Sequence, residues 1–285
     1  MYYGIIILSV VLFGASFFFQ DEYRKIRGNS LKISLQYAIP GTIAGLLILL
    51  IINKFKLSFT PFTLIMAVIN SINALLTVFC SFKALSKINL SLFSVFCMLG
   101  GMVLPFVQGI CFYGEPLTVS KILCFVLIVA ALMLTVEKGE RKSGYIYYAG
   151  VFVLNGMSGV ITKLFNELPF EKTDAASYSM LCAITSVIIA SAILFIFFRN
   201  KGDEPKTTLK ACVMSASSGG LNRIANFLLV IALTHVDASV QYPMVTGGTM
   251  IVSTIFCLIG GVKPKKKEVI SVIVAFFGML MLLIK

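Results

Sequence analysis

Charged side chains are scarce in this sequence. Asp, Glu, Lys and Arg make up only 13% of the 285 residues, whereas 58% are apolar. A soluble domain needs far more polar surface to cover its core. The composition therefore excludes an ordinary soluble protein and predicts a chain whose surface faces the lipid bilayer. The net charge of +12 does not indicate nucleic-acid binding, because membrane proteins gather Lys and Arg in short loops.

Residues that build metal and thiol sites are few and badly spaced. The only histidine is His235, which lies beside Asp237 in a short turn, and the seven cysteines include no CxxC pair. All seven lie in or at the edge of apolar stretches, as expected for free thiols that pack as small hydrophobic groups. We expect no metal, no cofactor and no disulfide framework, and we do not expect His235 to relay protons.

Long apolar runs dominate what is present, and about 20 mostly apolar residues suffice to span a bilayer. The first run is followed directly by Asp21 and Glu22 without a cleavage pattern, which favours a retained helix over a signal peptide. The predicted fold class is an all-α membrane protein with ten transmembrane helices. The candidate segments are Tyr3–Gln20, Leu31–Ile52, Pro61–Leu85, Leu90–Phe112, Val119–Val136, Tyr145–Phe165, Ala175–Phe198, Leu209–Leu233, Ala238–Gly260 and Val269–Ile284.

The second half of the chain resembles the first. Ala84-Leu85 matches Ala232-Leu233, and at the same offset Gly100 pairs with Gly248. We therefore predict a five-helix repeat over residues 1–138, a linker over 139–144 and a second repeat over 145–285. Because five is odd, the second copy must enter the membrane inverted, an arrangement that secondary transporters use to enclose a central site. The other matching pairs are Ser91 with Ser239, Met102 with Met250, and Gly14-Ala15-Ser16 with Gly156-Met157-Ser158.

Several short motifs, spread in order along the chain, resemble those of the EamA-type ten-helix transporters of the drug/metabolite transporter superfamily. They are Phe13-Gly14-Ala15-Ser16-Phe17, Ala84-Leu85, Gly114-Glu115-Pro116-Leu117-Thr118, the run from Asn155 to Lys163, and Ala232-Leu233. The second copy of the Gly-Glu turn, Gly260 to Pro264, lacks the glutamate. The resemblance implies a helical basket with a central polar cavity, and transport of amino acids, metabolites or drugs, often outward.

Ionisable groups at mid-membrane are costly and are functional candidates by default. Every Asp and Glu lies at a segment end or in a loop, which argues against a drug/proton antiporter for cations. Arg223 lies near the middle of its segment, where it cannot easily reach the membrane surface. Its planar guanidinium suits a carboxylate or phosphate on a substrate. The alternative is a structural arginine that hydrogen-bonds to carbonyls or amides within the bundle.

Amide side chains form the second group of candidate binding residues, because an amide in a spanning helix must face a partner or a cavity. For any single Asn, interhelical hydrogen bonding is the slightly better explanation, whereas for the group we favour a polar cavity. Together with Arg223, the predicted substrate-binding residues are Asn70, Asn73, Asn155, Asn222, Asn226, Gln241 and Tyr242. We predict no catalytic residues.

Most Lys and Arg residues lie in the loops after the odd-numbered segments. The positive-inside rule would then place both termini outside the cell, whereas the family resemblance implies cytoplasmic termini.

The predicted function is a secondary transporter in the plasma membrane, moving an amino acid or other zwitterionic or anionic metabolite by alternating access, as efflux or facilitated exchange. Multidrug efflux is the alternative. A membrane-embedded lipid enzyme or a channel is disfavoured, because no Asp, His or Glu cluster and no pore-loop motif is present. The expected partners are the solute and the lipid bilayer, and whether the protein is a monomer or homodimer is left open.

Overall fold

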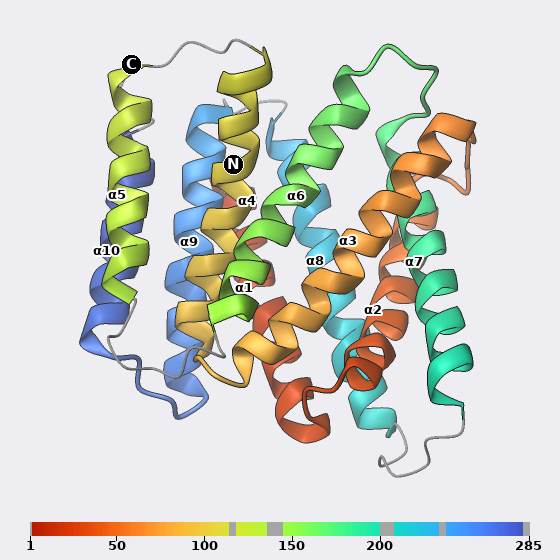
Figure 1. The fold of residues 1–285 in the computed structure, drawn as a ribbon, viewed down its shortest axis with the longest axis horizontal. Helices are drawn as coiled ribbons and strands as arrows, with labels where there is room; N and C mark the ends of the chain where they lie inside the picture. The colour runs from red at the N-terminus through yellow and green to blue at the C-terminus, as the bar shows by residue number, and fades with distance from the viewer. Residues whose placement is uncertain (1, 114–117, 136–144, 200–207, 234–237, 282–285) are drawn as a thin grey trace.

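A computed structural model describes residues 2–113, 118–135, 145–199, 208–233 and 238–281. The secondary structure in these ranges is entirely helical (Figure 1). The helices are α1 (Tyr2–Arg27), α2 (Leu31–Ile52), α3 (Pro61–Leu85), α4 (Leu90–Tyr113), α5 (Val119–Thr135), α6 (Tyr145–Glu167), α7 (Ala175–Phe198), α8 (Leu209–Leu233), α9 (Ala238–Ile259) and α10 (Lys266–Leu280).

Local sequence explains where several helices begin and end. The Ser30 side chain accepts a hydrogen bond from the Ile33 backbone N–H at 3.2 Å and caps α2. Thr60 and Asp174 cap α3 and α7 in the same way, so each satisfies a backbone donor that has no partner within its helix. Gly28 ends α1 with a positive φ of 99°, a conformation that glycine adopts without strain.

The first helix is longer than expected, because it runs to Arg27 and not to Gln20. The charged segment after Gln20 stays helical through ion pairs spaced three or four residues apart. Asp21 contacts Arg24 at 2.8 Å and Lys25 at 3.0 Å, and Glu22 contacts Lys25 at 2.7 Å. The apolar run therefore marked the part of α1 that suits lipid, and the helix itself continues beyond it.

The outer surface of the bundle is apolar, as a lipid-facing surface requires. Large aliphatic side chains such as Ile51 and Ile188 are 67% and 61% exposed. By length and composition, the helices long and apolar enough to cross a membrane are α1, α2, α3, α4, α6 and α7, among the described residues. The chain is thus an all-helical protein with several helices of membrane-spanning type.

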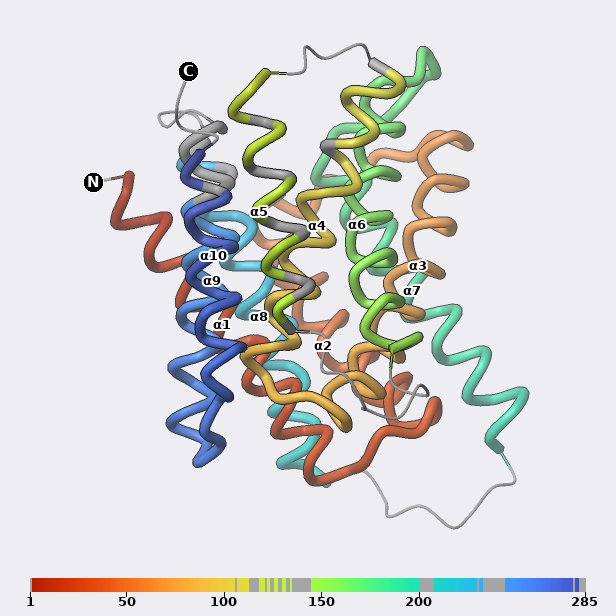
Figure 2. The backbone as a smooth tube through the Cα atoms, turned by 60° about the vertical axis from the view of Figure 1, so that its left-hand side comes forward, coloured from red at the N-terminus to blue at the C-terminus, as the bar shows by residue number. Residues whose placement is uncertain are grey.

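The two halves of the chain are interleaved. α5 packs against α10 at one edge of the bundle, and α2 packs against α7 toward the opposite edge (Figures 1 and 2). Between these edges, α1 packs on α8 and α9, while α3 and α4 both pack on α6. The start of α1 and the end of α10 lie at the same end of the bundle (Figure 2).

Glycines allow the closest helix contacts. At Gly219 of α8 a Cβ would lie 2.1 Å from the carbonyl oxygen of Gly41 on α2, and at Gly156 of α6 it would lie 2.5 Å from that of Gly100 on α4. On the other side of the bundle, Gly248 of α9 faces Val10 of α1. Such contacts bring backbones together where no larger residue fits.

Candidate functional site

A cavity of about 520 Å³ lies among α1, α2, α3, α4, α6, α7 and α8. It extends from Arg223, near the middle of α8, to Asn166 and Ala175, where α6 ends and α7 begins. We call it the large cavity, and we call that end of the bundle the α6–α7 end. Its described polar lining consists of Thr42, Asn70, Ser71, Asn155, Ser158, Thr162, Asn166, Tyr178, Ser179, Ser186, Asn222, Arg223 and Asn226.

A second cavity of about 200 Å³, the small cavity, continues from Arg223 toward the opposite end, where α1 ends and α2 begins. It is lined by Gln20 and Tyr37, among others, and shares Phe17, Thr42, Ala74, Ser186, Asn222 and Arg223 with the large cavity. Arg223 therefore lies where the large and small cavities meet. From there, the two cavities extend toward opposite ends of the helix bundle.

The Arg223 side chain lies over Gly45 of α2. A Cβ built on Gly45 would lie 2.6 Å from Cγ of Arg223 and 3.2 Å from its Nε, so the absence of a side chain there makes room for the arginine. Within the described residues Arg223 makes no hydrogen bond, and the ion pairs found there are confined to the end of α1. The alternative role, in which Arg223 is anchored by hydrogen bonds within the bundle, is therefore not supported by any hydrogen bond among the described residues.

The amides around Arg223 are partly engaged with one another and with backbone. Asn226 donates to the carbonyl oxygen and to Oδ1 of Asn222 at 2.8 and 3.1 Å. Asn155 donates to the carbonyl oxygen of Cys97 at 2.6 Å, which ties α6 to α4. Oδ1 of Asn70 accepts from Ser158 at 3.4 Å. These bonds hold the amides at the cavity wall.

The structure brings five of the predicted binding residues together, because Asn70, Asn155, Asn222, Arg223 and Asn226 all line the large cavity. Asn73 does not line either cavity.

Asn73 is buried and donates to the carbonyl oxygen of Leu154 at 2.9 Å, so it fastens α3 to α6. Gln241 and Tyr242 belong to α9, and their side chains lie outside the described residues, as does His235.

Several lining residues were missed at the sequence level. Ser158 and Thr162 follow Asn155 at spacings of three and seven residues, so a polar stripe on α6 could have indicated them. The aromatic wall gave no such signal. Phe165 and Tyr178 stack with ring centroids 4.1 Å apart, and Phe13 and Phe17 line the cavity from α1.

The small cavity ends at a hydrogen-bonded cluster that joins α1, α2 and α8. The hydroxyl oxygens of Ser16 and Ser218 lie 3.1 Å apart, and the Tyr37 hydroxyl lies 2.7 Å from that of Ser218. Beyond them, Tyr37 packs against Tyr23 and Phe82 with centroid distances of 5.0 Å for each pair. We call these five side chains the inner plug, because they pack together between Arg223 and the α1–α2 end.

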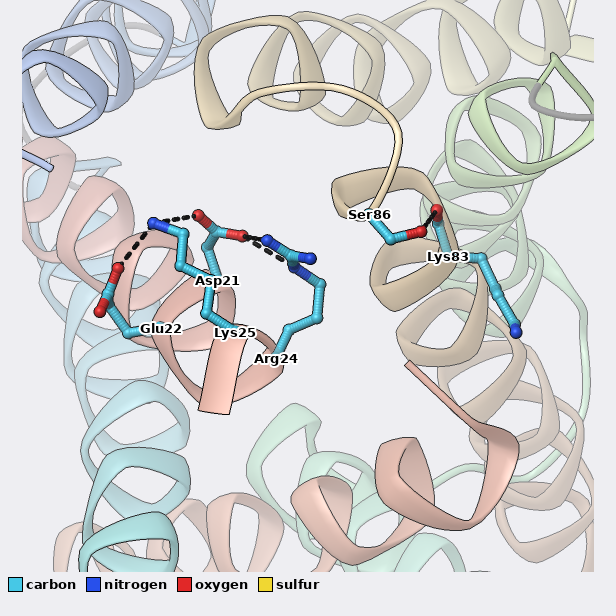
Figure 3. A network of polar contacts seen from close by, with 6 residues as sticks. All are labelled: Asp21, Glu22, Arg24, Lys25, Lys83 and Ser86. Carbon is cyan, nitrogen blue, oxygen red and sulfur yellow. Dashed lines mark hydrogen bonds and ion pairs between the residues drawn. The ribbon is translucent and has the colours of Figure 1, made fainter. Parts of the chain in front are cut away.

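The charged groups of the α1–α2 end lie beside a further cavity of about 250 Å³. Figure 3 shows Asp21 held between Arg24 and Lys25 on α1, facing the end of α3, where Ser86 donates to the Lys83 carbonyl oxygen. Asp21 is buried and already paired with two cations. It therefore does not supply a negative charge to the Arg223 site.

At the α6–α7 end, two loops are tied together. Ser58, in the loop between α2 and α3, donates to Asp174 at 3.0 Å, and its backbone N–H donates to Ser177 at 3.0 Å. Burial on its own would raise the pKa of Asp174, but hydrogen bonds from the Ser177 side chain and backbone and from Ser58 outweigh it and lower that pKa. The ionised carboxylate is thus the form that this loop contact stabilises.

In the part of the chain that the structure describes, no group of three or more His, Cys, Asp or Glu side chains is placed to hold a metal ion. The described lining of the large cavity offers one cation, uncharged donors and acceptors, and aromatic side chains, a combination suited to binding a small solute.

No family model and no curated protein matches this chain. Among solved structures, 21 chains match. One of them, described only as a crystal structure of a protein, is 14% identical and has a TM-score of 0.65 over 97% of this chain and 94% of that one. At this identity the likeness shows the fold alone.

Proposed function

We propose that this protein is a secondary transporter that moves a small polar organic solute across the plasma membrane by alternating access, as efflux or facilitated exchange. The observation that carries the proposal is Arg223: it stands without an ion-pair partner in the described part of the chain, at the junction of two cavities. A cation at mid-depth among membrane-spanning helices is costly unless an anion or water compensates its charge. A solute carboxylate or phosphate would supply that anion.

The packing of the helices supports two inverted five-helix repeats. If α1 to α5 correspond to α6 to α10, then the contact of α1 with α8 becomes that of α6 with α3, and the contact of α1 with α9 becomes that of α6 with α4. All of these contacts are present. The repeat-matched glycines agree, because Gly156 meets Gly100 across α6 and α4, while Gly14 and Gly248 lie in the matching contact of α1 with α9.

In this proposal ten helices span the membrane, and the chain is a member of the EamA-type transporters. Among the described residues, the basic side chains at the α1–α2 end include Arg24, Lys25, Arg27, Lys83 and Lys87, and the positive-inside rule assigns that end to the cytoplasm. The large cavity would then extend toward the outside and the inner plug would face the cytoplasm. Alternating access requires the plug to open while the α6–α7 end closes.

Multidrug efflux remains the second candidate, since the aromatic wall of the large cavity would suit apolar drugs. Cationic drugs fit poorly, because no carboxylate is found among the described lining residues of either cavity. A lipid-modifying enzyme or a channel has no supporting observation, and we propose no enzymatic activity.

Counterflow in proteoliposomes tests the proposal. We expect accumulation of at least one labelled solute from a panel of amino acids, organic acids and nucleotide sugars, with and without a pH gradient. Arg223→Ala should abolish it, whereas Arg199→Ala, which removes an arginine that packs over Phe195 outside the cavities, should leave it intact. Normal counterflow by purified, correctly folded Arg223→Ala protein would overturn the assignment of the site, and no counterflow of any solute would overturn transport.

A further inference from the structure

The charged side chains that line the two cavities restrict the possible solutes more narrowly than the polar ones do. Among the described lining residues of both cavities, the only side chain that is ionised at neutral pH is Arg223. The described carboxylates all lie at helix ends or in loops: Asp21, Glu22, Glu167, Glu171, Asp174 and Glu268. As far as the described residues go, the site therefore offers one positive charge and no negative charge.

We infer that the solute is an organic monoanion, with one carboxylate on Arg223 and an uncharged body against the aromatic wall, and that it is not a zwitterionic amino acid. The inference rests on the proposed function, because it names the solute of the same site. A guanidinium binds a carboxylate through two parallel N–H···O bonds, which fixes orientation as well as charge.

A zwitterion would bring an ammonium group that this site cannot neutralise. In an α-amino acid bound through its carboxylate, the ammonium would lie within about 5 Å of the guanidinium, where the two like charges repel each other. The nearby amide oxygens are partly engaged already, since Oδ1 of Asn222 accepts from Asn226 and Oδ1 of Asn70 accepts from Ser158.

A phosphate monoester fits less well for the opposite reason. It carries a charge of about −1.5 to −2 at pH 7, more than one guanidinium can balance. Phe13, Phe17, Phe165 and Tyr178 provide apolar wall for a ring-sized body within the 520 Å³ of the large cavity. A monocarboxylate with an apolar body matches both the charge and the wall.

Four compounds that carry a phenyl ring and differ in charge test the inference. They are 3-phenylpropionate, an anion; L-phenylalanine, a zwitterion; 2-phenylethylamine, a cation; and phenyl phosphate, which is close to a dianion at neutral pH. Binding is measured by the rise in unfolding temperature of the purified protein in detergent, which does not require transport.

We expect 3-phenylpropionate to stabilise wild-type protein at concentrations about tenfold or more below those at which phenylalanine or phenyl phosphate does so. The amine should give no shift. Arg223→Gln should lose the shift with 3-phenylpropionate, and Arg199→Gln should keep it. Equal or stronger binding of the zwitterion, the amine or phenyl phosphate would overturn the inference. So would a shift that survives in Arg223→Gln, or no shift with any of the four.

Counterflow of labelled 3-phenylpropionate separates this inference from the proposed function. Arg223-dependent binding without counterflow supports the monoanion site and counts against transport. Counterflow of phenylalanine with binding equal to that of 3-phenylpropionate supports transport and overturns the monoanion site.

Discussion

The position of the Arg223 guanidinium depends on the residue at position 45 being a glycine, which has no side chain. Gly45 on α2 leaves the space that Arg223 occupies, since a Cβ at Gly45 would lie only 2.6 Å from the arginine Cγ. Cγ lies partway along a flexible side chain, so the side chain can shift without moving a helix. The guanidinium would then leave its place at the junction of the two cavities.

Gly45→Ala should therefore weaken binding of 3-phenylpropionate by roughly tenfold while leaving the unfolding temperature of the ligand-free protein close to that of the control variant, because binding through a two-point contact is sensitive to position. Gly220→Ala is the matched control. A Cβ there meets only Ile48 Cδ1 at 3.5 Å, an ordinary contact, and both substitutions raise helix propensity by about 1 kcal/mol. Equal affinity in the two variants would show that Gly45 does not position the arginine.

At the scale of single helices, the sequence was informative about length and poor about orientation. The predicted bounds of α2, α3 and α8 are those of the structure. For α2 and α3 the sequence marks the start, because Ser30 and Thr60 are capping residues and Pro61 suits the first position of a helix. Rotation about the helix axis could not be predicted. A helix that is apolar on all sides has no polar stripe to indicate which face meets the cavity.

The neighbouring amides of α3 illustrate this limit. Asn70 and Asn73 are both polar groups in an apolar helix and lie three residues apart, yet Asn70 lines the large cavity and Asn73 binds the Leu154 carbonyl oxygen of α6. Either role satisfies an amide inside a membrane protein, so residue type alone does not distinguish them. The same reasoning explains why Phe165 and Tyr178 were missed as lining residues, since aromatic side chains occur throughout the chain.

The start of α7 is coupled to pH through Asp174. Because the pKa of this carboxyl is lowered by its hydrogen bonds, its contribution to stability is complete above the ordinary pKa of 3.8 and is lost as the pH falls through that value and below it. We therefore expect the unfolding temperature of wild-type protein to fall as the pH is lowered from about 5.5 to 3.

Asp174→Asn should flatten that fall, because asparagine caps the helix but does not titrate. Glu171→Gln serves as the control for loss of one charge in the same loop, since Glu171 contributes its backbone carbonyl, and not its side chain, to the contact with Thr60. Thermal unfolding of the three proteins across this range checks the prediction. Identical pH profiles for wild type and Asp174→Asn would contradict it.

At the scale of the whole molecule, the charge at the site is asymmetric, whereas several helix contacts occur in pairs that the proposed repeat would match. The contacts of α1 with α8 and of α6 with α3 are equivalent under the proposed repeat, but Arg223 occurs on α8 alone. If the protein is the alternating-access transporter proposed above, the repeat would allow two conformations of similar energy in which the two ends exchange roles. Under the same proposal, Arg223 would bind the solute in both conformations.

The inner plug is where this exchange can be stopped. Ser16 on α1 and Ser218 on α8 lie on the wall of the small cavity with their hydroxyl oxygens 3.1 Å apart, close enough for paired cysteines to form a disulfide. In the double variant Ser16→Cys, Ser218→Cys, oxidation should lock the plug shut. We expect oxidised protein to keep its binding of 3-phenylpropionate, because Arg223 stays accessible from the large cavity, and to lose counterflow until a thiol reductant restores it.

Each single variant, treated with the same oxidant, controls for reaction of the seven native cysteines. Undiminished counterflow by fully cross-linked protein would show that solute does not pass between α1 and α8, and the route would have to be sought elsewhere in the bundle.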